Sequence, residues 1–226
     1  IRYAARIAIE NQPVSEWENK VLNAKKADTV ITGAVALARM GESSSLDALL
    51  NKLLSLELAK LSESQKLELS RAYALAFVRM GEPGSKNLAK RLVDSFDSQY
   101  PAESADLNRE LSQLLVFLKA PSVIDKTLSM MDTKVASTMV VDKEALERND
   151  GYGGTIKKVL ANTPEIQNLH YAMTLRNLRY GWKEDQRKKY FEWYKDAATK
   201  SGGVSYGGFL KNFQKDALAN APAKER

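Results

Sequence analysis

Basic and aromatic side chains alternate over residues 176–195, and these residue types suit one kind of chemistry. Cations bind phosphates and aromatic rings stack on bases, so the segment is a candidate nucleic-acid-binding surface. The residues of this candidate interaction surface are Arg176, Arg179, Trp182, Arg187, Lys188 and Lys189. Four acidic residues lie among the cations and cancel much of their charge: Glu184, Asp185, Glu192 and Asp196. We therefore favour a second interpretation, in which the rings at 190, 191, 193 and 194 face the core and the cations form a solvated helix face.

The one histidine of the chain, His170, is the next candidate for chemistry. It lies in a helical pattern, and no serine in a nucleophile-elbow context accompanies it. Glu165 precedes it by five residues, so the two side chains do not share a helical face. The chain has no cysteine, which excludes thiolate metal sites, disulfides and a cysteine nucleophile. We expect His170 at a helix–helix interface, and we predict no catalytic residue, no cofactor and no metal ligand.

A glycine-rich stretch, Asn-Asp-Gly-Tyr-Gly-Gly, occupies residues 149–154. Its spacing matches neither the dinucleotide-binding nor the nucleotide-phosphate loop, so we favour a turn between helices. Asn149 and Asp150, with backbone carbonyls, leave open a calcium site. A further alternative is carbohydrate binding by exposed rings of Trp182, Trp193 and Tyr206.

The elements that position these residues are all predicted to be helices. Apolar residues recur at helical spacing along most of the chain, and no strand pattern occurs. Ser15 and Ser62 are predicted N-caps, each followed three residues later by Glu or Gln as in a capping box. The expected helical segments are 1–10, 15–22, 28–40, 46–54, 62–80, 88–96, 107–118, 123–131, 164–180, 183–200 and 205–219.

The tetrapeptide Arg-Met-Gly-Glu occurs at 39–42 and again at 79–82, an interval of 40 residues. Phe77 and Phe117 keep the same interval. A self-match at this period is typical of stacked-helix repeats. The predicted fold class is all-α, a HEAT/armadillo-like alpha–alpha superhelix, right-handed, of about six or seven helix pairs. We expect one domain over 1–226, with regular repeats at 1–131 and a less regular part at 132–226.

Arginines occur inside otherwise apolar helical segments. In stacked helices such side chains bind carbonyls at helix ends or carboxylates of adjacent repeats. We favour this structural role over a concave ligand-binding ridge. The arginines concerned are Arg2, Arg6, Arg39, Arg71, Arg79, Arg109 and Arg176.

Net charge and hydropathy restrict the partners only weakly. Lys and Arg number 34 against 28 Asp and Glu, so the formal net charge of +6 is mild for 226 residues. No apolar stretch approaches the length of a membrane span. The chain opens inside a helical pattern without a methionine, and we interpret it as a piece of a longer or processed protein.

Several strings resemble one family along nearly the whole chain: Arg-Tyr-Ala-Ala-Arg-Ile-Ala-Ile-Glu at 2–10, Arg-Met-Gly-Glu-Pro at 79–83 and Tyr-Phe-Glu-Trp at 190–193. They resemble the HEAT-like helical region of large bacterial secreted proteins. In that family the region accompanies a sugar-dehydrogenase-like propeller and a haem-binding c-type cytochrome domain. The resemblance implies an extracytoplasmic location, periplasmic or secreted, and any redox chemistry would reside in other domains.

The expected function is that of a non-catalytic helical scaffold that presents a surface to a protein partner or to a sister domain of the same chain. The alternative is a nucleic-acid-binding protein of the DNA-alkylation-repeat type, acting through residues 176–195.

Overall fold

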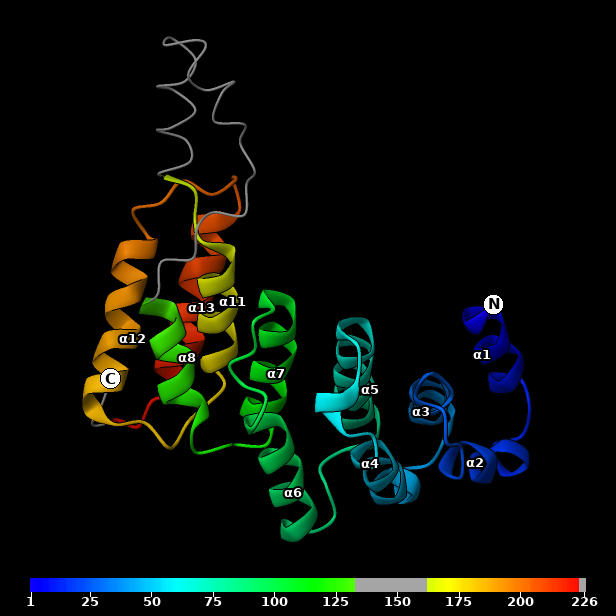
Figure 1. The fold of residues 1–226 in the computed structure, drawn as a ribbon. Helices are drawn as coiled ribbons and strands as arrows, with labels where there is room; N and C mark the ends of the chain where they lie inside the picture. Colours follow the sequence, from blue (N-terminus) through cyan, green and yellow to red (C-terminus); the bar gives the residue numbers. More distant parts are fainter. Residues whose placement is uncertain (133–161, 224–226) are drawn as a thin grey trace. The chain divides into compact units, whose positions relative to one another are not determined.

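Eleven α-helices and two short 3-10 turns make up the part of the chain that the computed structural model describes, residues 1–132 and 162–223 (Figure 1). No strand occurs within these two ranges, so the all-α prediction is confirmed. In the same ranges, no helix is both long and apolar enough to cross a membrane. The backbone contacts divide the chain into two compact units, Ile1–Ala120 and Pro121–Arg226, each of which is described by itself.

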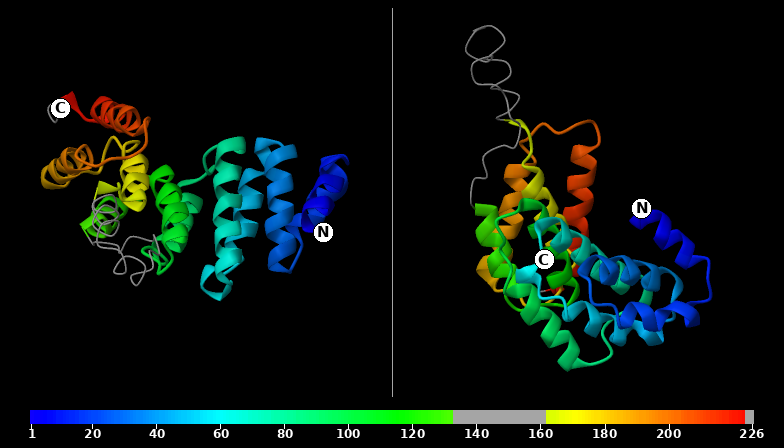
Figure 2. Two further views of the ribbon diagram at one scale, coloured as in Figure 1. Left: turned by 90° about the horizontal axis from the view of Figure 1, so that it is seen from above. Right: turned by 45° about the vertical axis from the view of Figure 1, so that its right-hand side comes forward.

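The first unit is a row of helices in two layers. The helices α3, α5 and α7 pack side by side in one layer, whereas α4 packs against α6 in the other (Figure 2). The short helix α1 packs on α3 and adds to the first layer, and α2 contacts both α3 and α4. The bounds are α1 Arg2–Glu10, α2 Val14–Leu22, α3 Ala27–Met40, α4 Leu46–Leu54, α5 Glu63–Met80, α6 Lys86–Asp97 and α7 Ala105–Phe117, with 3-10 turns at Ser43–Ser45 and Leu58–Lys60.

Residues 40 positions apart in the sequence, the predicted interval, contact one another in the structure. Nη2 of Arg79 donates to the carbonyl of Arg39 over 3.2 Å. The rings of Phe77 and Phe117 stack with centroids 4.6 Å apart. In the second layer, Arg91 donates to Asn51, also 40 residues apart, over 2.8 Å. Corresponding positions of successive helices therefore lie next to one another.

Local sequence signals explain most helix boundaries in this unit. The capping box predicted at Ser62 forms: the Gln65 amide donates to Oγ of Ser62 over 3.3 Å, and the Ser62 amide donates to Oε1 of Gln65 over 3.2 Å. Helix α5 ends at Met80 because Gly81 takes φ of 109°, which side chains disfavour. The cap predicted at Ser15 is wrong. The N-cap of α2 is Pro13 and the helix begins at Val14, whereas a cap at Ser15 would have it begin at Glu16.

The core of the first unit is formed by apolar side chains on the helix faces that point toward the other layer. The helical spacing of the leucines at 46, 49, 50, 53 and 54 predicts a buried stripe. The first four are buried in α4, whereas Leu54 at its last position is half-buried. The buried leucines share the interior with large side chains of the neighbouring helices, among them Leu37, Leu69, Tyr73, Phe96 and Leu111.

The second unit contains four described helices around an aromatic core. They are α8 Val123–Asp132, α11 Ile166–Leu175, α12 Glu184–Ala197 and α13 Tyr206–Asn220. Helix α11 is shorter than the predicted 164–180. At its end, the Arg176 and Asn177 side chains donate to the carbonyls of Met173 and Thr174. The backbone amides of Asn177 and Leu178 donate to the carbonyls of Thr174 and Leu175, so the last turn is tightened.

Candidate functional sites

The buried residue of the predicted basic surface is Arg187, which is only 5% exposed. Its guanidinium carbon lies 4.9 Å from the centroid of the Trp182 ring, and its Nη2 donates to the carbonyl of Arg179 over 3.2 Å. The Trp182 indole in turn donates to the carbonyl of Leu178 over 3.0 Å. Arg187 and Trp182 therefore stabilise the turn between α11 and α12. Both side chains are engaged inside the protein and do not form an exposed cation–ring pair for a ligand.

Two further cations of that surface are held by carboxylates. Nε of Arg176 lies 3.3 Å from Oδ2 of Asp216 on α13, and its guanidinium stacks on Phe213 at 5.0 Å. Lys189 forms an ion pair with Asp132 at the end of α8. Only Arg179 and Lys188 of the predicted set are exposed side chains without a carboxylate partner among the described residues, and Arg179 lies over the ring of Tyr180.

The aromatic residues of α12 divide as helical spacing dictates. Tyr190 and Tyr194 are buried, and their hydroxyl oxygens are 2.9 Å apart. Tyr190 also donates to the carbonyl of Ala172 over 2.7 Å. Burial raises the pKa of Tyr194 to about 12, and burial together with the neighbouring Tyr194 raises the pKa of Tyr190 well above its usual value. The inward orientation is thus confirmed for these two rings, whereas Phe191 and Trp193 are half-buried.

The other predicted sites are more ordinary. His170 is half-buried on α11, edge-on to Tyr171 with ring centroids 6.4 Å apart. Within residues 1–132 and 162–223, no three side chains of metal-binding type come together. Residues 149–154 lie outside the described ranges. Trp182, Trp193 and Tyr206 are half-buried, and the Tyr206 hydroxyl donates to the carbonyl of Ala197 over 2.7 Å.

The structural role predicted for the helix arginines is confirmed where they bond to another helix, whereas the ion pairs of Arg6 and Arg109 join each to a carboxylate of its own helix. Arg2 donates to both oxygens of Glu68, over 2.9 and 3.1 Å, and Nε of Arg71 donates to Glu110 over 2.8 Å. The remaining contacts join Arg6 and Arg39 to Glu10, Arg79 to the Arg39 carbonyl, Arg109 to Asp106 and Arg176 to Asp216.

One edge of the first layer exposes apolar side chains in the last turns of three successive helices. Met40 of α3 is 45% exposed, Val78 of α5 81% and Phe117 of α7 37%. The contacts of Arg79 with the Arg39 carbonyl and of Phe77 with Phe117 bring these helix ends together. We call the surface formed by Arg39, Met40, Val78, Arg79 and Phe117 the α3–α5–α7 edge.

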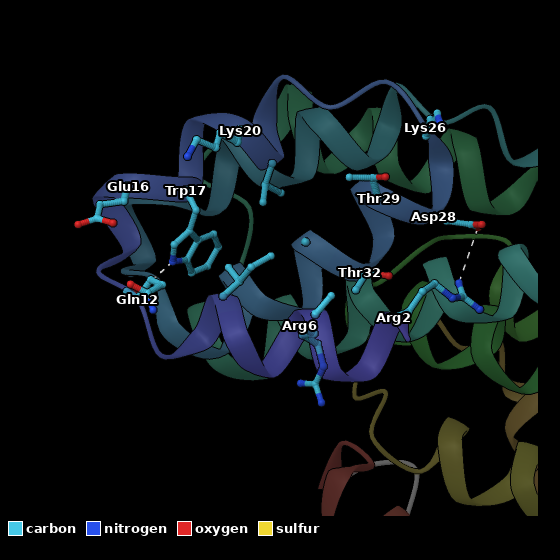
Figure 3. A pocket seen from close by; sticks show the side chains of 14 residues that line it. Arg2, Arg6, Gln12, Glu16, Trp17, Lys20, Lys26, Asp28, Thr29 and Thr32 are labelled. Carbon is cyan, nitrogen blue, oxygen red and sulfur yellow. Dashed lines mark hydrogen bonds and ion pairs between the residues drawn. The ribbon is translucent and has the colours of Figure 1, made fainter.

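A cavity of about 650 Å³ lies where α1 and α2 diverge over α3 (Figure 3). Trp17 of α2 points in between α1 and α2, and its indole donates to the carbonyl of Gln12 over 3.2 Å. Ala5 and Ile9 line the α1 side, and Val21 lines the α2 side. A Cβ added to Gly33 would lie 2.7 Å from Cγ2 of Val21, so glycine permits the close approach of α2 to α3 at the base of the cavity.

Charged side chains surround this apolar interior. Four are basic and two are acidic, namely Arg2, Arg6, Lys20 and Lys26 against Glu16 and Asp28. Asp28 accepts from Gln65 over 2.8 Å and lies 3.7 Å from Arg2. The bonds to Glu68 and the charge of Asp28 raise the pKa of Arg2. The cavity was not predicted from the sequence, although the basic residues of α1 and the tryptophan of α2 that line it could have pointed to it.

The chain matches no known protein-family model, no curated protein and no solved structure.

Proposed function

We propose that this protein is a non-catalytic helical scaffold of the HEAT/armadillo kind, one repeat domain over 1–226, whose α3–α5–α7 edge binds a protein partner. Repeat arrays of this kind present corresponding positions of successive helices along one continuous surface. Contacts between residues 40 positions apart carry the proposal, since they bring the ends of α3, α5 and α7 together.

The composition of the edge suits a protein partner. Protein interfaces combine apolar anchors with arginine, and Val78 is an apolar side chain almost wholly in solvent beside Arg79. The partner is a separate protein or a sister domain of a larger secreted bacterial chain, as the family resemblance implies.

Site-specific cross-linking tests the proposal in the native host. In one variant of the intact protein, a photoreactive phenylalanine analogue replaces Val78. In a control variant, the same analogue replaces Asn87, which is exposed and lies outside the edge. We expect one discrete adduct from position 78, reduced by Arg79→Glu, and none from position 87. Mass spectrometry of the adduct distinguishes a separate partner from a sister domain. Adducts of equal yield from both positions, or none from position 78, would refute the proposal.

A further inference from the structure

We propose that the cavity between α1, α2 and α3 binds a small organic anion with an apolar body and a carboxylate or sulfonate head. This inference goes beyond the scaffold proposal and does not depend on it, because the cavity and the α3–α5–α7 edge share no residue.

The size and interior of the cavity suit the apolar body. Ligand sites in proteins commonly measure about 300–1,000 Å³ and are lined by apolar and aromatic groups, and this cavity measures about 650 Å³. The indole N–H of Trp17 is already bonded to the Gln12 carbonyl, so the ring offers only its apolar surface. Ile9 of α1 also lines the cavity and adds a further apolar side chain to it.

The charges at the rim favour an anionic head. Arg2 lies between Glu68 and Asp28, a group with a net charge of about −1. Glu10 lies between Arg6 and Arg39, a group with a net charge of about +1, so the two groups offset one another. Lys20 and Lys26 are exposed, and neither forms an ion pair with any residue in the described part of the chain. Glu16 is the one rim carboxylate, among the described residues, for which no cation is within ion-pair distance. Two uncompensated lysines against one carboxylate leave the rim attractive to a negative head.

Two fluorescent probes of nearly the same shape isolate the contribution of charge. 1-Anilinonaphthalene-8-sulfonate is an aromatic anion, and N-phenyl-1-naphthylamine has the same rings without the sulfonate. We expect the intact protein to bind one molecule of the sulfonate, about fivefold more tightly than the amine. Raising the salt to about 1 M should remove most of this preference, because it screens exposed charges.

Matched substitutions place the binding in the cavity. Ala5→Phe fills the cavity from an exposed helix position and should weaken both probes at least about tenfold. Ala4→Phe makes the same change one residue away, outside the lining, and should leave both affinities unchanged. Circular dichroism verifies that both variants are folded.

Substitution of the lysines tests the choice of an anion. Lys20→Gln with Lys26→Gln should reduce sulfonate binding about fivefold and leave the amine unchanged. The control, Lys25→Gln with Lys86→Gln, removes the same charge from two exposed lysines outside the lining. Unaltered binding in Ala5→Phe, or no binding of either probe by the wild type, would overturn the site. Equal effects of the two lysine pairs would overturn the selection of an anion.

Discussion

The two compact units use the same residue type, arginine, in opposite ways. In the first unit Arg71 reaches across from α5 to Glu110 on α7 with 63% of its side chain exposed. In the second unit Arg187 is buried against Trp182 and holds a backbone carbonyl. The first contact links neighbouring helices of a row, whereas the second fixes a turn.

This difference shows that environment, and not residue type or spacing, decides what a basic residue contributes. Exposed ion pairs typically stabilise by no more than about 1 kcal/mol. A buried cation whose partners are lost leaves unsatisfied polar groups and destabilises considerably more. The two units should therefore respond very differently to the loss of one arginine.

The largest expected effect is that of Arg187→Ala. It removes the stack on Trp182 and the bond to the Arg179 carbonyl, so the free energy of unfolding should fall by about 2–3 kcal/mol. The neighbouring Lys188→Ala, at an exposed position, should change it by less than about 0.5 kcal/mol. Chemical denaturation followed by circular dichroism measures both values, and hydrogen exchange locates the change within 166–220.

Equal stabilities of the two variants would contradict the buried role of Arg187. Arg187 would then be an exposed cation, available to contact phosphates as the nucleic-acid interpretation of residues 176–195 requires. A mobility shift of duplex DNA at low salt, where phosphate contacts are strongest, would next test that interpretation.

Much of the fold follows from local sequence signals. The leucines of α4 were sufficient to predict a helix with one buried face, and the capping box at Ser62 was sufficient to predict the start of another helix. The interval between the Arg-Met-Gly-Glu strings predicted which helices lie side by side. The early end of α11 was not predictable in this way, because no glycine or proline follows Leu175 directly to mark it.

The candidate sites were less accessible to sequence reasoning. The sequence predicted that all four rings at 190, 191, 193 and 194 face the core, and the structure buries only Tyr190 and Tyr194 of them. It gave no means of telling buried Arg187 from exposed Lys188, since both adjoin the same aromatic residues. The cavity beside Trp17 arises from the angle at which α1 and α2 diverge over α3, and that angle is set by packing between helices.

A middle-sized effect is expected at alkaline pH in the second unit. The folded-state pKa of Tyr194, about 12, exceeds the ordinary value of 10, so the unfolded chain releases its proton first as the pH rises. The folded state is favoured fully below pH 10 and loses about 1.4 kcal/mol from this group for each pH unit between 10 and 12.

Tyr194→Phe separates this titration from the loss of a hydrogen bond. The variant lacks the contact with the Tyr190 hydroxyl at every pH, but its stability should fall less steeply above pH 10. Urea denaturation at pH 9, 10 and 11 gives the slopes. Burial also raises the pKa of Tyr73 in the first unit, so Tyr73→Phe provides the matched test there. Identical slopes for the wild type and Tyr194→Phe would show that Tyr194 titrates as it does in the unfolded chain.

The smallest expected effect is the coupling between Arg71 and Glu110, measured by a double-mutant cycle with alanine at each position. Their 2.8 Å contact lies at the surface, where water and salt weaken it, so the coupling should be about 0.2–1 kcal/mol and decrease in about 1 M salt. A value this small means that apolar packing stabilises the row, while the ion pair adds mainly to the specificity of α5 for α7. A coupling above about 2 kcal/mol that persists in high salt would remove the contrast with Arg187, because the two arginines would then contribute alike despite their different burial.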